Sequence, residues 1–185
     1  MNRFILARDV RDCARFMCDQ HIRKMIIEEA QMLSTVIRRR LPGYAGEHPG
    51  LYKSCYEGHP CTVWAGLNQG NFRVALALWL SMVVEYRHRW SKDHETSVKL
   101  SGTFIGATNS NEFNSQLKRE SRTPHPQCFG EHVECKTTEL WPVDAYRAYY
   151  DVKQITFRRP MTWTRRARPE WLALPRIGAG AAAAA

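Results

Sequence analysis

Two long stretches with the repeat of an α-helix constrain this chain more than any other feature. Between Asp19 and Arg40 the apolar residues recur at three- and four-residue steps, which places them on one helix face. They are Ile22, Met25, Ile26, Ala30, Leu33, Val36 and Ile37. The second stretch, about Gln69 to Trp90, is the most apolar in the chain. Because strand-like alternation is scarce, we predict an all-α or mainly α domain.

Shorter patterns complete the expected architecture. Further helices are predicted at about 10–18 (with Asp9 as N-cap), 60–67, 93–106 and 143–157. Residues 2–9 are expected to form a short strand or an extended lead-in, and 41–50 and 107–140 to form loops. Prolines predict an extended or turn-rich course from about 158 to 172. The 185 residues suit one helical domain over 1–177 with long irregular loops, and 178–185 as a low-complexity tail.

The charge balance points to a polyanionic partner. Lys and Arg outnumber Asp and Glu by 27 to 18, for a net charge of +9. The arginines cluster near the end at Arg158, Arg159, Arg165, Arg166, Arg168 and Arg176. Glu170 is the only acid among them, and Trp163 and Trp171 are interleaved. Guanidinium groups bind phosphates and aromatic rings stack on bases, so the run predicts nucleic-acid contact. The alternative is a solvated basic tail.

Several classes of protein are disfavoured. No run of 18 apolar residues predicts a membrane helix, and the start lacks the order of a signal peptide. The six cysteines are therefore expected as free thiols, with Cys13 and Cys18 in the core. The phosphate loop, the dinucleotide fingerprint and the serine-hydrolase elbow are all missing from the sequence. No cofactor is predicted.

A polar stripe on the first long helix is the first candidate site. His21, Lys24, Glu28 and Gln31 are spaced by three, four and three residues, and Asp19 directly precedes them. Histidine can transfer a proton near neutral pH, lysine can hold an anion and a carboxylate can orient either group. An ordinary solvated helix face would show the same pattern.

A second candidate set lies in the loop before the predicted helix at 60–67. It contains Lys53 and His59 as cationic or titrating groups and Tyr52 and Trp64 as rings, a combination that can line a pocket. The alternative is that the rings belong to the core and that His59 caps the helix.

A third set lies on the predicted helix at 143–157. Tyr146, Tyr150 and Lys153 share one face, with Arg147 beside them. The two cations can clamp phosphate, whereas tyrosines on a helix are more often half-buried packing residues.

The 107–140 region contains the pattern H-x2-C-x3-H-x2-C. Its residues His125, Cys128, His132 and Cys135 can all ligate Zn²⁺, and the spacing permits a closed structural site. The usual C-x2-C knuckle is missing, so zinc is the minor alternative and no metal is predicted.

Three segments together resemble a family found in tailed-phage genomes. The first is Asp19-Gln20-His21-Ile22-Arg23-Lys24-Met25 followed by Glu29-Ala30-Gln31-Met32-Leu33. The second contains Leu51, Tyr52, Lys53, His59, Pro60 and Trp64, and the third contains Ala145 to Tyr150 with Pro169 and Trp171. This family resembles the amino acid:DNA transferases of thymine hypermodification, which are related to helical pyrophosphorylase-like proteins. The chain departs from the family pattern at Gln20, at Arg23 and in 107–140.

The resemblance implies an enzyme of the infected bacterial cytoplasm that acts on double-stranded DNA. It would replace the pyrophosphate of 5-(pyrophosphomethyl)uracil with the amine of an amino acid, typically glycine. Lys24, Lys53 and Arg147 would then neutralise the leaving group, and Lys153 the amino-acid carboxylate. His21 or His59 would act as base, oriented by Glu28 or Asp19. The base would be flipped onto Trp64, Tyr146 or Tyr150, while Arg158, Arg159, Arg165, Arg166 and Arg168 held flanking phosphates.

Two other classes remain open. One is a non-catalytic DNA-binding accessory protein, in which the arginines act and the polar stripes are plain surface. The other is a helical DNA glycosylase or nuclease with Asp19 or Glu28 as its acid.

Overall fold

The computed structural model describes residues 2–173. Within that range the chain forms eight α-helices and no sheet, so the predicted mainly α single domain is confirmed. The helices are α1 (Val10–Phe16), α2 (Asp19–Arg40), α3 (Pro42–Glu47), α4 (Pro60–Ala65), α5 (Gln69–Trp90), α6 (Glu95–Asn109), α7 (Asn111–Gln116) and α8 (Val143–Thr156). The predicted tail, 178–185, and Arg176 lie outside the described residues.

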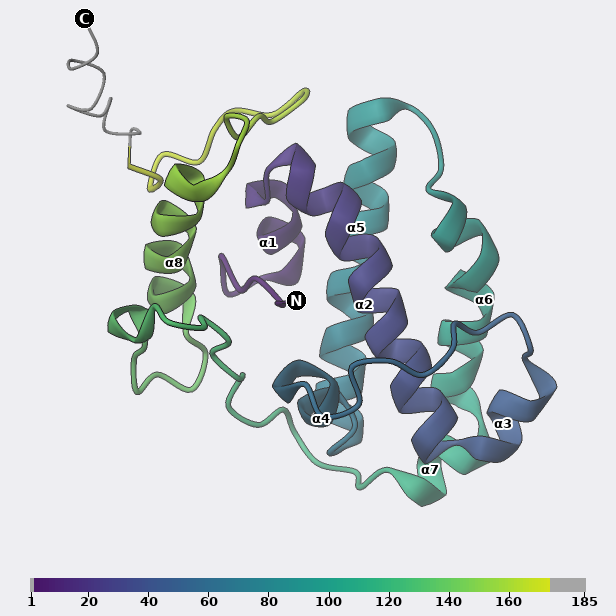
Figure 1. Cartoon of the computed structure of the whole chain (residues 1–185). Helices are drawn as coiled ribbons and strands as arrows, with labels where there is room; N and C mark the ends of the chain where they lie inside the picture. The colour runs from purple at the N-terminus through teal and green to yellow at the C-terminus, as the bar shows by residue number, and fades with distance from the viewer. Residues whose placement is uncertain (1, 174–185) are drawn as a thin grey trace, which may run out of the picture.

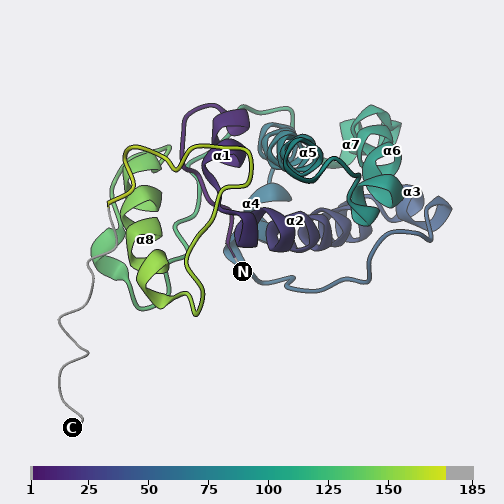
Figure 2. The same cartoon turned by 90° about the horizontal axis from the view of Figure 1, so that it is seen from above.

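Helices α2 and α5 pack against each other and form the centre of the molecule (Figure 1). Helix α1 covers α5 on one side, while α3, α4 and α6 contact α2. The view from above shows α8 at one end of the molecule and α3, α6 and α7 at the other (Figure 2). Helix α8 therefore reaches α2 only near the start of α2.

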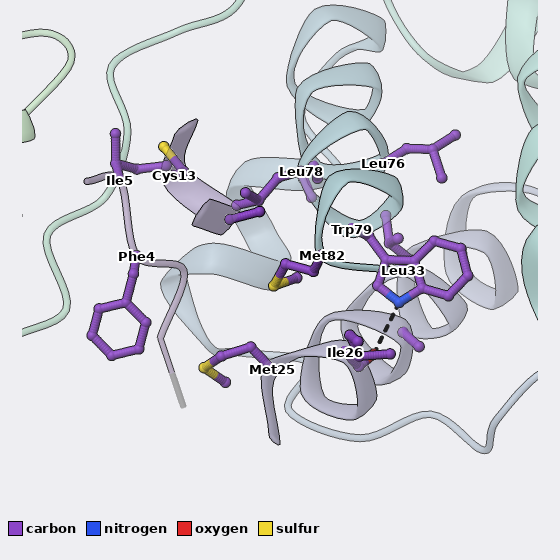
Figure 3. Packing of buried hydrophobic residues seen from close by; sticks show 14 of the residues in the cluster. Phe4, Ile5, Cys13, Met25, Ile26, Leu33, Leu76, Leu78, Trp79 and Met82 are labelled. Atoms are coloured by element: carbon purple, nitrogen blue, oxygen red, sulfur yellow. Dashed lines mark hydrogen bonds between the residues drawn. The ribbon is translucent and has the colours of Figure 1, made fainter. Parts of the chain in front are cut away.

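The core lies between the facing sides of α2 and α5 (Figure 3). All seven apolar residues that predicted the α2 face are buried. Trp79 of α5 is fully buried and its Nε1 donates to the Ile26 carbonyl at 2.9 Å, which satisfies the indole where water cannot reach (Figure 3). The cysteines are all free, and Cys13 and Cys18 are buried as predicted.

Local signals in the sequence located most helices correctly. The bounds of α2 and α5 agree with the prediction, and Asp9 caps α1 by accepting from Arg11 N at 2.8 Å. Pro60 opens α4 and Pro142 precedes α8. The stretch after α8 has no regular structure up to residue 173, as its prolines predicted.

Two predicted loops contain helices. Residues 42–47 form α3 because Glu112 of α7 accepts hydrogen bonds from Gly43 N and Tyr44 N and so caps the helix from a distance. Residues 111–116 form α7, which Ser110 caps and which buries Phe113 against Phe72. Each helix is six residues long, too short for a repeat to be recognised.

Residues 2–9 are an extended lead-in without strand pairing. Phe4, Ile5 and Leu6 are almost fully buried, so the segment passes through the core. Phe4 packs against Tyr146, Tyr149 and Tyr150 and so connects the lead-in to α8.

A chain of buried charges attaches the C-terminal segment to the helices. Asp19 lies 3.0 Å from Arg89, which lies 2.7 Å from Glu85, and Glu85 also binds Arg166 at 2.9 Å. Burial opposes ionisation of Asp19, but hydrogen bonds from Thr162, Thr164 and Arg89 hold its pKa below the usual range. The network therefore joins α2, α5 and residues 162–166.

No helix among residues 2–173 combines the length and hydrophobicity needed to cross a bilayer.

The buried pair Arg3–Glu29 tests how strongly charges stabilise this core. Arg3 donates to both carboxylate oxygens of Glu29, and neither side chain is more than 2% exposed. Glu29→Gln leaves Arg3 buried without a counter-charge, so we expect a loss of about 3 to 5 kcal/mol in urea unfolding. Glu57→Gln in the exposed pair Arg39–Glu57 should cost no more than about 1 kcal/mol. Equal losses of unfolding free energy in Glu29→Gln and Glu57→Gln would contradict the stronger stabilising role that we assign to the buried pair.

Candidate functional site

A small polar pocket lies where the lead-in, the start of α2 and α8 meet. Its volume is about 90 Å³. It is lined by Asn2, Phe4, His21, Lys24, Met25, Glu28, Tyr149 and Lys153. Three residues of the polar stripe of α2 and one cation of α8, predicted as site residues from separate segments, therefore share one pocket, whereas Gln31 of the stripe does not line it.

The pocket contains both signs of charge. Lys24 Nζ lies 3.3 Å from Glu28 Oε1, one helical turn away, and the lysine remains largely exposed. The other carboxylate oxygen, Glu28 Oε2, is buried and has no hydrogen-bond partner among the described residues. Lys153 lies over the Tyr149 ring, 5.2 Å from its centroid. An unsatisfied buried carboxylate oxygen is costly, so this atom is a natural position for a donor from a ligand.

His21 forms the inner wall of this pocket. It is 6% exposed, stacks on Phe4 with ring centroids 4.3 Å apart, and contacts Phe157. Burial, and then the charges of Lys153 and Lys24, lower its pKa to about 3. The imidazole is therefore neutral at physiological pH and can accept a proton only transiently.

A hydrogen bond to Tyr150 orients His21. The Tyr150 hydroxyl lies 2.7 Å from His21 Nδ1 and accepts from Cys18 N at 2.8 Å. When the hydroxyl donates to Nδ1, the proton of His21 is on Nε2, which becomes a donor. When Nδ1 carries the proton, Nε2 offers a lone pair and can act as a base. The tautomer thus decides which role His21 plays.

The aromatic residues predicted to stack on a base lie in the core. Tyr150 is fully buried, and Tyr146 is buried with its hydroxyl donating to Asn2 Oδ1 and the Pro126 carbonyl. Trp64 is 4% exposed and its Nε1 donates to Thr123 O. In this structure the three rings serve as packing and orienting groups, because other side chains cover their faces.

The 52–64 segment does not contribute to the pocket. Tyr52 bonds to Thr96 of α6, and Lys53 is exposed without a partner among the described residues. His59 caps α4 by accepting from Cys61 N at 3.2 Å, which is the alternative that the sequence left open. Of the three segments predicted to meet, only α2 and α8 line the pocket, and the lead-in takes the place of 52–64.

Two further predicted residues have structural contacts. Arg147 donates to the Leu6 carbonyl and lies over the Trp171 ring. Asp19 is occupied by Arg89, Thr162 and Thr164. Neither lines the pocket.

The arginine run divides into two parts. Arg165 donates to His88 O and Ser91 Oγ, Arg166 to Glu85, and Arg168 to Gln154 Oε1, so these three hold the C-terminal segment in place. Arg158 and Arg159 are exposed and make no hydrogen bond or ion pair within residues 2–173.

The four residues of the minor zinc alternative, His125, Cys128, His132 and Cys135, do not form a cluster. Within residues 2–173 the only cluster of metal-ligating side chains is His59, Cys61 and Cys128. His125 is instead buried between Trp64, Trp141 and Tyr146, and neither ring nitrogen has a described partner. His132 contacts Glu134. Cys61 was not predicted as a ligand, because it lies 67 residues from Cys128.

Four pocket residues were missed from the sequence: Asn2, Phe4, Met25 and Tyr149. Met25 was assigned to the core, and Tyr149 lay beside the predicted face of α8. For Asn2 and Phe4 the only signal was an extended apolar lead-in, which does not specify a neighbour.

Comparisons of this chain with protein-family models, curated proteins and solved structures return no match.

The lowered pKa of His21 predicts a pH-dependent stability. The folded-state pKa of about 3 lies below the unfolded value near 6.5, so protons bind more tightly to the unfolded chain. The contribution of the buried, neutral His21 to the free energy of unfolding is complete above pH 6.5. It is lost as the pH falls toward 3. Between pH 6 and 5 the wild type should lose about 1.2 kcal/mol more stability than His21→Gln. The exposed His88→Gln is the control. Parallel pH profiles of wild type and His21→Gln would refute the buried neutral state.

Proposed function

We propose that this protein transfers the amine of an amino acid, glycine in the first instance, to 5-(pyrophosphomethyl)uracil in duplex DNA. The observation that carries the proposal is the pocket in which Lys24 and Lys153 accompany the carboxylate of Glu28, one oxygen of which has no hydrogen-bond partner among the described residues. We infer the type of reaction from the resemblance of the chain to the phage amino acid:DNA transferases.

The charges of the pocket suit a zwitterion. An amino acid presents an ammonium, which can donate to the Glu28 carboxylate, and a carboxylate, which Lys24 and Lys153 can bind. The pocket is small, about 90 Å³, and accommodates the smallest amino acid, glycine.

The same residues can supply the acid–base chemistry. The ammonium loses a proton to Glu28 or to the Nε2 lone pair of His21, which frees the nitrogen lone pair. The nitrogen then forms a bond to the methylene carbon on C5 of the base. The bond from that carbon to the pyrophosphate oxygen breaks, and pyrophosphate leaves with the electron pair. The guanidinium groups of Arg158 and Arg159 can stabilise the negative charge that develops on the leaving pyrophosphate.

Arg158 and Arg159 are the groups that we assign to DNA. Phe157, directly before them, contacts His21 with ring centroids 5.0 Å apart. Pro160, directly after them, accepts a hydrogen bond from Gln20 Nε2 at 2.7 Å. The backbone on both sides of Arg158 and Arg159 is thus held near the start of α2, and their exposed side chains are available to phosphates of a bound duplex or to the pyrophosphate.

The geometry favours this reading over a glycosylase or nuclease that uses Asp19. Both oxygens of Asp19 are engaged by Arg89, Thr162 and Thr164, and the pKa of the carboxyl is held low, so it is a poor general acid.

The first test uses pocket variants in a transfer assay. Duplex carrying the pyrophosphomethyl base is incubated with glycine and the full chain, and the nucleosides are analysed by mass. We expect Glu28→Gln to lower kcat by about 100-fold or more, because it removes the proton acceptor. Lys24→Met should mainly raise the KM for glycine. Lys53→Ala, an exposed lysine outside the pocket, should behave as the wild type.

Other outcomes assign the rival functions. Base loss or strand breaks would identify a glycosylase or nuclease. An unchanged nucleoside profile with intact duplex binding would identify an accessory protein.

The second test concerns the arginines. Replacing both Arg158 and Arg159 by alanine should weaken binding to unmodified duplex and reduce the slope of log K against log salt by about 0.9 for each lost phosphate contact. Lys99→Ala is the control, since this exposed lysine is on α6, at the other end of the molecule from α8 (Figure 2). A slope that is unchanged in the double variant would remove these arginines from the interface.

A further inference from the structure

A second cluster of reactive side chains lies apart from the pocket. It consists of His59 at the start of α4, Cys61 in the first turn of α4, and Cys128 in the long segment between α7 and α8. One ligand atom from each residue lies within 4.8 Å of the others. The two thiols are 3.7 Å apart.

The distance between the sulfurs matches metal coordination. With Zn–S bonds of about 2.3 Å and tetrahedral angles, two thiolates on one zinc ion lie about 3.8 Å apart. The observed 3.7 Å therefore needs almost no movement of either sulfur. The ligand nitrogen of His59 lies within 4.8 Å of both sulfurs, so the imidazole has to approach them by up to about 1 Å to complete the set.

The surroundings also suit a thiolate site. Arg3 donates to the Cys61 carbonyl at 3.3 Å, which fixes the backbone of that ligand. The Cys128 carbonyl accepts from Asn2 Nδ2 at 2.7 Å, which fixes the backbone of that ligand. Cys61 is buried, but His59 and Cys128 are partly exposed, so an ion and a water ligand can enter from solvent.

We propose that His59, Cys61 and Cys128 bind a thiophilic metal ion, Zn²⁺ in the first instance, with a fourth position open to water. On binding, each thiol loses its proton to solvent as its sulfur bonds to the metal. The ion would join α4 to the segment 117–132, which contains no helix or strand. This inference does not rest on the proposed function.

Metal binding would also act on the pocket. Asn2 lines the pocket and donates to Cys128 O, so fixing Cys128 fixes one wall of the pocket. The metal would then have a structural role, with a loaded protein more stable than the metal-free one.

The test uses the full chain, stripped with a chelator under reducing conditions, and titrated with Zn²⁺ alone and with Co²⁺ alone. We expect one ion per chain, a cobalt spectrum with thiolate charge transfer and tetrahedral ligand-field bands, and a higher Tm with zinc.

Three variants remove one ligand each: His59→Asn, Cys61→Ser and Cys128→Ser. Asparagine is a good helix N-cap, so His59→Asn keeps the start of α4 while it removes the imidazole. Each should weaken zinc affinity by more than the roughly 10- to 100-fold that loss of an outer-shell partner costs. Helical circular dichroism checks that each variant is folded. If Cys61→Ser does not fold, His59→Asn and Cys128→Ser decide.

Three control variants separate this site from the set that the sequence suggested. Cys135→Ser and His132→Ala change predicted ligands that lie outside the cluster, and Cys55→Ser changes a thiol in neither set. All three should bind zinc as the wild type does. Loss of binding in Cys135→Ser or His132→Ala would overturn the proposal, as would wild-type affinity in His59→Asn and Cys128→Ser. A Cys61–Cys128 disulfide that persists in the reduced preparation, with no bound metal, would also overturn it.

Discussion

The position of the C-terminal segment, residues 162–166, depends on the buried charge chain Asp19–Arg89–Glu85–Arg166. Arg89 is completely buried between two carboxylates, so removing either partner would leave a charge that the core cannot solvate. Because Asp19 begins α2 and Glu85 lies near the end of α5, the network fixes where residues 162–166 rest. It thereby holds the residues after α8 against the start of α2, beside the pocket.

The lead-in connects the two sites that we describe. Asn2 lines the polar pocket, accepts from the Tyr146 hydroxyl and donates to the Cys128 carbonyl. Arg3 contacts both the Glu29 carboxylate and the Cys61 carbonyl. A short extended segment with few regular hydrogen bonds thus supplies polar groups in two directions, because its apolar residues Phe4, Ile5 and Leu6 anchor it in the core.

Sequence patterns located the long helices and half of the pocket. The stripe His21, Lys24 and Glu28 was visible because residues three and four apart share a helix face. Lys153 was found on α8, but nothing in its spacing showed that it faces Lys24. The aromatic residues at 64, 146 and 150 were more ambiguous, since the same side chain can stack on a ligand or fill a core, and in this fold they are buried. The possible metal-ligand set at 125–135 came from residues close together in the sequence. The cluster in the structure instead brings Cys61 next to Cys128, which is far from it in the sequence.

The sequence by itself determined the mainly α class, the bounds of α2 and α5, and the shared face of the polar stripe, because helical repeats and caps act within a few residues. Only the tertiary structure decided α3, whose cap comes from Glu112, and the meeting of α2 with Lys153. It also decided which cysteines approach each other and which arginines remain free for a ligand. Those outcomes depend on contacts between residues far apart in the chain, where local spacing carries no information.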